Sequence, residues 1–273
     1  MFQFETRQKT RSSAISMLEL IYHSVVRSIR KTHNNAVMSL VINMLQTITF
    51  VAAFYVMFTV LGLRGAALRG DFVLYIMSGI FIFMIHTKTV SAVTRAEGPS
   101  SPMMKHAPMN TIIALAASAF GALYIQVLSL VGVLFIYHIA FTPVVIEDYS
   151  GAMGMVGLAW LTGVGVGMIF LALRPWFPSF VSIGSQIYNR ANMIASGKMF
   201  VANSLPSFML AFFDWNPLFH IIDQARGFVF INYNPHYTNY EYPIIVAVVL
   251  ILLGLMGEFY ARKNASLSRE ASR

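Results

Sequence analysis

Long apolar runs separated by short polar segments divide most of the chain. Runs at 37–61, 72–92, 111–140, 152–173, 178–197 and 243–260 are each long enough to cross a bilayer as a helix, which takes about 20 mainly apolar residues. They predict an all-α, polytopic membrane protein with six transmembrane helices. The fifth run is the most polar of the six, because it carries Gln186, Asn189, Arg190 and Asn192.

The leader, residues 1–36, has a different pattern. Apolar residues spaced three and four apart share one helical face, and polar residues occupy the rest; the apolar positions are Ile15, Leu18, Tyr22, Val25 and Ile29. The spacing predicts an amphipathic helix, followed by Arg30 and Lys31. Such a helix can lie in the membrane interface with its basic side toward anionic headgroups, or it can pack on a soluble partner.

Composition excludes an ordinary soluble domain. Of the 273 residues, 57% are hydrophobic and only 11% are charged, against about 25% charged in soluble proteins. The net charge of +8 would suggest nucleic acid in a soluble protein, but in a membrane protein the placement of the charges matters more, and no nucleic-acid partner is predicted. The chain has no cysteine, which excludes thiol chemistry and Cys-ligated metals.

Lysine and arginine gather in alternate segments. The leader holds six, the end of the second span with the loop after it holds three, and the tail at 261–273 holds four. The segments between them hold two, none and one. Since basic residues favour the cytoplasmic side, both termini are predicted to be cytoplasmic, and an even number of spans agrees with this. No cleavable signal peptide is apparent, so the first span is expected to be retained as an anchor of the permease domain at 37–260.

Between the fifth and sixth spans, residues 199–242 predict short, partly re-entrant helices on the outer side. Asn216 can cap a helix that begins at Pro217, and Gly227 can end it. Leu218, Ile221, Ile222 and Ala225 would share its apolar face, with His220, Asp223, Gln224 and Arg226 offering polar contacts. His220, Asp223 and His236 form too incomplete a ligand set, so no metal site is predicted. Tyrosines at 233, 237, 240 and 242 suit an interfacial belt or stacking on carbohydrate.

Two further segments have a predicted structural role. Glycines at 154, 157, 163, 165 and 167 of the fourth span predict a close helix–helix approach. The cytoplasmic segment 95–108 is rich in residues that end helices, and it reads as a short element accessible to a soluble partner or as a plain loop; its marked residues are Gly98, Pro99, Pro102, Lys105 and Pro108.

The sequence lacks the motifs of several classes of membrane protein, and these absences disfavour proton-coupled transport and enzymatic hydrolysis. Secondary transporters use acidic or histidine relays near the midplane, and the sequence places His86, His138 and Glu258 near span ends. Arg190 is the one charge well inside a span, and it can hold an anion but cannot carry protons. No phosphate-binding G-x-x-x-x-G-K-[ST] loop occurs, and hydrolytic motifs such as H-E-x-x-H and G-x-S-x-G are absent. An enzyme is therefore disfavoured, and any ATPase must be a separate chain.

The segment SGKMFVANSLPSFMLAFFDWNPLFHIIDQARG, residues 196–227, resembles permease subunits of type 2 ABC exporters, and within them the branch that exports capsular polysaccharide in Gram-negative bacteria. The matching positions are Ser196, Gly197, Phe200, Leu205, Pro206, Trp215, Asn216, Pro217, Leu218, His220 and Arg226. Asp223 stands where the family usually has Glu. The first span reads NNAVMSLVINMLQ from Asn34, without the Gly-x-x-Trp and Glu-Pro pattern that the family often has there.

The resemblance implies an inner-membrane permease that pairs with a second copy of itself and with two ATP-binding subunits. It would move a lipid-linked, anionic polysaccharide, with periplasmic or outer-membrane export proteins as further partners. ATP and Mg would bind to the partner subunit, and this chain would hold no cofactor. Segment 95–108 would couple to the ATPase. The candidates for the substrate path are Arg190, Asn43, Gln46 and Gln126. The candidates for a gate on the outer side are Trp215, Asn216, Pro217, His220, Asp223 and Arg226.

Three alternatives stay open. An ABC exporter of a lipid or drug would share the same architecture. A membrane enzyme acting on lipid-linked sugars would be active without any ATPase. A membrane scaffold would tolerate substitution of Arg190 or Trp215.

Overall fold

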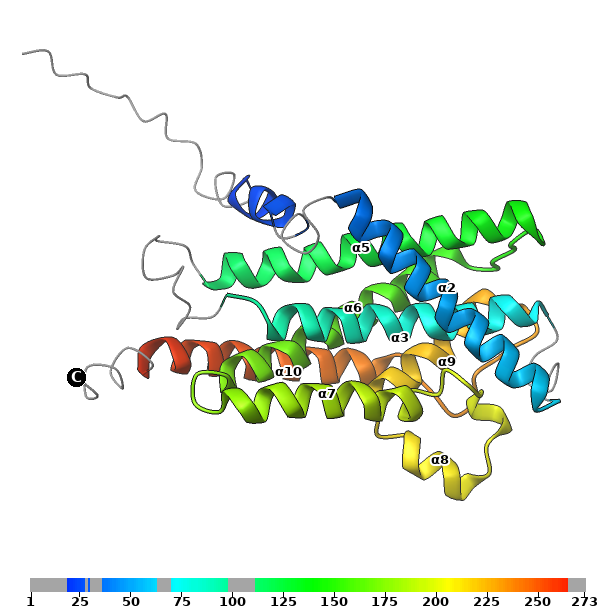
Figure 1. Ribbon diagram of the computed structural model, residues 1–273. Helices are drawn as coiled ribbons and strands as arrows, with labels where there is room; N and C mark the ends of the chain where they lie inside the picture. Colours follow the sequence, from blue (N-terminus) through cyan, green and yellow to red (C-terminus); the bar gives the residue numbers. More distant parts are fainter. Residues whose placement is uncertain (1–18, 28, 30–35, 63–69, 98–110, 265–273) are drawn as a thin grey trace, which may run out of the picture.

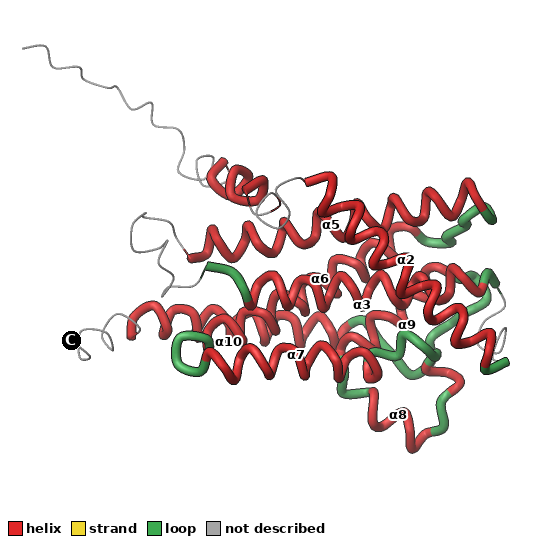
Figure 2. Tube along the Cα trace, viewed as in Figure 1, coloured by secondary structure: helices red, strands yellow, loops and turns green. Residues whose placement is uncertain are grey.

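The computed structural model describes residues 19–27, 29, 36–62, 70–97 and 111–264. Helices make up all the regular structure in these ranges, and Figure 2 shows no strand among them. The helices are α2 (Ala36–Val60), α3 (Phe72–Thr94), α5 (Thr111–Ala140), α6 (Tyr149–Leu173), α7 (Pro178–Ala195), η1 (Ala202–Ser204), α8 (Ser207–Phe213), α9 (Pro217–Val229) and α10 (Glu241–Asn264). Residues 19–27 are also helical.

Five helices are long and apolar enough to cross a membrane. They are α2, α3, α5, α6 and α10, which match five of the six predicted spans within a few residues at each end. The predicted fifth span forms a helix as well, α7, but its polar side chains keep it out of this set. The all-helical, multi-pass fold is therefore confirmed with five apolar spans.

Consecutive long helices run in opposite directions between two ends of the molecule (Figure 1). Arg95, Arg174, Arg262 and Lys263 lie at the end where α3, α6 and α10 finish, which we call the basic end. Asp71, Asp148 and Glu241 lie at the opposite end, where the same three helices begin, which we call the acidic end. The charges that the sequence distributes among alternate loops are thus separated in space.

Helix α3 lies at the centre of the bundle. It packs against α2, α5, α6, α7 and α9, and most of its side chains are buried, whereas α2, α5 and α10 leave much of their apolar surface exposed. The exposed surface is what a bilayer would cover. His86, expected near a span end, instead lies inside α3 and is fully buried, where its ring nitrogens contact Thr162 of α6 and Tyr188 of α7.

Carboxylates fix the start of two spans at the acidic end. Asp148 caps α6 through the backbone N–H groups of Ser150 and Gly151, and Asp71 caps α3 through those of Val73 and Leu74. Asp71 also accepts hydrogen bonds from the hydroxyls of Tyr137 and Thr142, each at 2.6 Å. Partial burial opposes ionisation of Asp71, but these hydrogen bonds outweigh it and hold the pKa of the carboxyl below its ordinary value.

The glycines of α6 divide into two groups. A Cβ on Gly163 would lie 2.8 Å from the backbone oxygen of His86, and one on Gly167 would lie 2.7 Å from the Cβ of Val93, so both glycines let α3 approach closely. Gly165 does the same toward Leu250 of α10. A Cβ on Gly154 or Gly157 would have no neighbouring atom within 4 Å. The predicted close approach is therefore made by the second half of the glycine series.

The leader and the coupling segment are described only in small part. Of the residues expected on the apolar face of the leader helix, Tyr22 has 65% of its surface exposed, whereas Ile29 is buried. Ile15, Leu18 and the tail at 265–273 lie outside the described residues. So do the coupling candidates Gly98, Pro99, Pro102, Lys105 and Pro108.

Two glycines of the same helix give a matched test of this packing. We expect Gly163→Ala to lower the free energy of unfolding by about 1–3 kcal/mol, because the new methyl group would collide with the α3 backbone. Gly157→Ala should leave stability unchanged or raise it by up to about 1 kcal/mol, since alanine favours the helix. Thermal unfolding of both variants in one detergent would measure this. Equal effects would contradict the described α3–α6 contact.

Candidate functional site

A cavity of about 510 Å³ opens in the basic half of the molecule. Its walls are one face each of α2, α3 and α5, together with Ser24, Arg27 and Ile29 of the leader. Pockets of roughly 300–1,000 Å³ are typical of small-molecule sites. The cavity is therefore large enough for a phosphate or a sugar ring.

Helical spacing explains how the walls form. On α3 the lining residues are Lys88, Ser91, Ala92 and Arg95, at the i, i+3, i+4 and i+7 positions of one face. On α5 the lining positions recur in the same way and are mostly small, at Ala114, Ala117, Ser118, Gly121 and Ala122. Because these side chains are short, they leave room between the two helices. The basic side chains of α3 thus face the small side chains of α5 across the cavity.

Three of the four predicted substrate-path residues line this cavity. The Gln126 amide donates to Asn43 Oδ1 at 3.0 Å, and the Asn43 amide donates to Ser129 Oγ at 2.8 Å, so this pair ties α5 to α2. Gln46 accepts a hydrogen bond of 2.5 Å from the Lys88 ammonium group. Arg190 lies elsewhere, exposed on α7, and does not line the cavity.

The basic residues of the cavity were missed as site residues. From the sequence, Lys88 and Arg95 count among the basic residues that orient the spans, Arg95 also opens the predicted coupling segment 95–108, and Arg27 lies on the polar side of the predicted leader helix. The signal that could have found them is the i, i+3, i+4, i+7 series at the end of an otherwise apolar α3. Glu97 is the one acidic residue among the lining positions.

At the acidic end, a buried arginine holds the turn that follows α7. Arg226 of α9 has no exposed surface, and its guanidinium donates to the backbone oxygens of Gly197, Lys198 and Phe200. The ring of Tyr75 lies 4.4 Å below it, in cation–π geometry. Non-helical backbone buried in an apolar bundle must find hydrogen-bond partners. Arg226 supplies three of them from a single side chain.

Asp223, one turn before Arg226, completes the same support. It is 1% exposed and accepts from the Ala202 backbone N–H, the Tyr233 hydroxyl and the Thr238 hydroxyl at 2.5–3.0 Å. Burial and the neighbouring Asp223 carboxylate both raise the pKa of Tyr233 far above its ordinary value, so the phenol stays protonated and donates. Asp223 therefore joins three segments: η1, α9 and the loop before α10.

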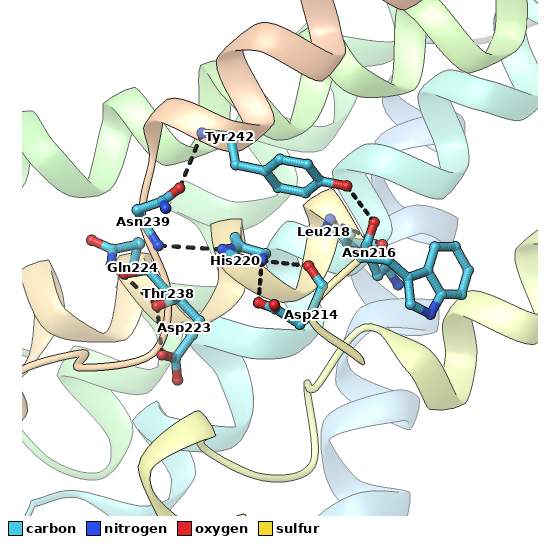
Figure 3. A network of polar contacts seen from close by, with 10 residues as sticks. Asp214, Asn216, Leu218, His220, Asp223, Gln224, Thr238, Asn239 and Tyr242 are labelled. Atoms are coloured by element: carbon cyan, nitrogen blue, oxygen red, sulfur yellow. Dashed lines mark hydrogen bonds and ion pairs between the residues drawn. The ribbon is translucent and has the colours of Figure 1, made fainter. Parts of the chain in front are cut away.

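Asn216 and His220 connect α9 to its other neighbours (Figure 3). The Asn216 side chain caps α9 through the Leu218 N–H and donates to Asn192 Oδ1 and to the Ala195 oxygen of α7. His220 Nε2 lies 2.7 Å from the Asp214 backbone oxygen, and its Nδ1 accepts from the Asn239 N–H at 3.2 Å. The proton of the neutral ring is therefore on Nε2.

These contacts correct the expected form of the outer helix. It was expected to be an amphipathic helix at the outer interface whose polar residues offer polar contacts; His220, Asp223 and Arg226 do make such contacts, but inside the bundle, where they are as buried as the apolar residues of the helix. It also continues through Gly227 to Val229, with Gly227 packed against Pro235. Tyr233 is likewise buried, while Tyr237 and Tyr240 are exposed as an interfacial belt requires. Trp215 is 66% exposed, just before the N-cap of α9.

Two residues of the turn itself have unusual surroundings. Gly197 has φ +68°, and the Phe219 ring occupies the place where a Cβ would be, so a side chain there would be both strained and blocked. The Lys198 ammonium has no hydrogen-bond partner and lies 3.7 Å above the Phe83 ring and 5.1 Å from that of Phe54. Burial lowers the pKa of Lys198 to about 8.

The chain is similar in sequence to known polysaccharide transport proteins. No known family model matches the chain. Two curated proteins, both described as polysialic acid transport protein KpsM of Escherichia coli, are each 21% identical to it over 198 residues, which cover 72% of this chain and 76% of the relative. The similarity to a polysaccharide transport protein confirms the resemblance that residues 196–227 indicate.

A substitution at Arg226 tests whether this residue supports the fold. We expect Arg226→Met to lower the free energy of unfolding by on the order of 3 kcal/mol, because the buried turn would lose three charge-assisted hydrogen bonds. Arg262→Met, at an exposed arginine of α10, is the matched control and should stay within about 0.5 kcal/mol of the unsubstituted chain. The readout is thermal unfolding in detergent. An Arg226 variant as stable as the control would show that the turn needs no such support.

Proposed function

We propose that this chain is the membrane permease subunit of an ATP-driven exporter that moves a lipid-linked, anionic polysaccharide across the bacterial inner membrane. The observation that carries the proposal is the occurrence in one chain of five apolar helices and similarity to a polysialic acid transport protein. The separation of basic and acidic ends supports an orientation in which the basic end faces the cytoplasm.

In this proposal α7 is a sixth crossing. Its 18 residues rise about 27 Å at 1.5 Å per residue, close to the thickness of the hydrocarbon core. It runs between the same two ends as the apolar helices and packs against α3 and α6 (Figure 1). Six crossings return the chain to the side on which it began, so both termini would be cytoplasmic.

The polar face of α7 supports a substrate path between two copies of the chain. Ser182, Gln186 and Arg190 recur every four residues, and all three are exposed. An arginine facing lipid at this depth is costly, whereas one facing a wet path beside a second copy is not. Arg190 would then contact the anionic chain as it passes, through weak and repeated interactions that do not halt it.

Energy would come from a separate ATP-binding subunit docked at the basic end. The start of the coupling segment, residues 95–97, continues directly from α3. Arg174, after α6, donates to the backbone oxygens of Thr94 and Ala96 at 3.4 and 3.3 Å. A push on segment 95–108 would therefore move the ends of α3 and α6 together.

At the outer side, the contacts favour α8 as the moving part of the gate. Helix α9 is held by the buried bonds of Asn216, Asp223 and Arg226, whereas α8 projects from the bundle and has no buried residue (Figure 1). We infer that α8, with Trp215 at its end, moves against a fixed α9.

Purification with native partners tests the assembly. The tagged chain, extracted in mild detergent, should bring down an ATP-binding subunit in equal amount, with ATPase activity that falls when the 98–108 segment is altered. Genes for glycosyltransferases beside it would favour polysaccharide over a lipid or drug. A chain that purifies alone and converts lipid-linked sugars without ATP would instead support the membrane-enzyme alternative.

Charge at Arg190 tests the proposed path. We expect Arg190→Glu to reduce export of the anionic polysaccharide at least about tenfold, because a like charge within the path repels the chain. Arg190→Lys should keep most of the activity, and neither change should alter thermal stability, since the side chain is exposed. Surface polysaccharide on a deletion strain that carries each variant is the measurement. Unchanged export by Arg190→Glu would remove Arg190 from the path.

A further inference from the structure

We propose that the cavity between the leader helix, α2, α3 and α5 binds the phosphate of an anionic lipid headgroup, held by Lys88 and Arg95. This inference rests on the proposed function for its biological meaning, but not for its chemistry or its test. The bound lipid could be a membrane phospholipid or the lipid end of the exported glycan, because both carry the same phosphate.

The cavity carries two basic side chains on one wall. Lys88 and Arg95 lie one above the other on the same face of α3, two turns apart. Lys88 donates to the Gln46 amide oxygen, and Arg95 Nε donates to the Ser91 backbone oxygen; both acceptors are neutral. Neither residue forms an ion pair within the described part of the chain. Neither charge is therefore neutralised by a salt bridge to a described residue, and an anion would be stabilised between them.

Two other charged residues line the same cavity. Arg27 of the leader helix adds a third cation, and Glu97 adds a carboxylate. Arg27 and Glu97 each already have an interaction partner, so the proposal rests on Lys88 and Arg95. With three cations and one carboxylate, the lining residues keep a net positive charge.

The surface beside the cavity has exposed apolar side chains. Ile42 of α2 lines the cavity and is still 40% exposed, and Leu45, three residues further along the same helix, is exposed as well. A ligand with an anionic head in the cavity would thus find apolar surface beside it for acyl chains. A soluble phosphate would use none of that surface, which is why the proposal commits to a lipid.

The position of the cavity along the bundle also suits a lipid headgroup. The cavity lies in the basic half of the bundle and is walled on one side by the leader helix, whose amphipathic pattern suits the membrane interface. Lys88 is six residues from the end of α3, so in a membrane spanned by α3 its ammonium would reach the level where headgroups meet hydrocarbon. A lipid phosphate occupies the same depth.

The full-length chain, purified in detergent, can be tested with fluorescent phosphatidylglycerol and phosphatidylcholine as probes. We expect it to bind phosphatidylglycerol more tightly, and the double variant Lys88→Gln with Arg95→Gln to lose this preference, with affinity for phosphatidylglycerol about tenfold or more lower. The matched control is Arg262→Gln with Lys263→Gln, which removes the same charge at the same end but outside the cavity, and it should keep the preference. Lys88→Arg should keep it too, and thermal unfolding will show that each variant is folded.

The other outcomes separate the possible sources of the phosphate. Displacement of the labelled lipid by millimolar inorganic phosphate alone would overturn the lipid assignment. Equal loss in the cavity variant and the control, or no loss in either, would overturn the site. A glycan-bearing lipid phosphate that competes better than phosphatidylglycerol would identify the exported lipid as the ligand, and equal competition would identify membrane phospholipid. Because the assay needs neither ATP nor transport, its failure leaves the proposed export function standing, and a failure of export leaves the binding result standing.

Discussion

The buried guanidinium of Arg226 is the interaction on which the outer half of the molecule depends. The chain leaves α7 through a left-handed glycine and passes through the bundle as non-helical backbone, where unpaired carbonyl groups would be costly. Arg226 pairs with three of those carbonyls, and Asp223 pairs with the N–H of Ala202 and two hydroxyls from the loop before α10. Helix α9 therefore acts as an internal brace, and its position also determines where α8 leaves the bundle.

Much of this architecture could be predicted from sequence. Long apolar runs are an unambiguous signal because a bilayer-spanning helix must satisfy its own backbone, and five of the six predicted spans appear within a few residues of their expected bounds. The Asn216–Pro217 start of α9 was equally readable from capping chemistry. Its end was not, because Gly227 stays helical where Pro235 packs closely against it. That contact comes from a loop that local sequence cannot place.

The candidate site was less predictable, for a physical reason. Polar residues inside spans attract attention, so Asn43, Gln46 and Gln126 were singled out, and they do meet on one cavity. Lysine and arginine near span ends have an ordinary explanation in membrane orientation, which concealed that Lys88 and Arg95 share a face with Ser91 and Ala92. Burial of the polar face of α9 was also unpredictable, since His220, Asp223 and Arg226 find their partners on four different segments. Periodicity identifies a face but not what covers it.

In the proposed exporter, the basic end binds the lipid headgroup and the ATP-binding subunit. The acidic end controls release of the polysaccharide. The central claim is that this chain forms the membrane path of an ATP-driven polysaccharide exporter. The most direct measurement places the purified chain and its ATP-binding partner in sealed vesicles and follows a labelled lipid-linked polysaccharide offered on the side where ATP is added. The account predicts ATP-dependent protection of the glycan from an added glycosidase. A glycan that stays fully accessible while ATP is hydrolysed would contradict it.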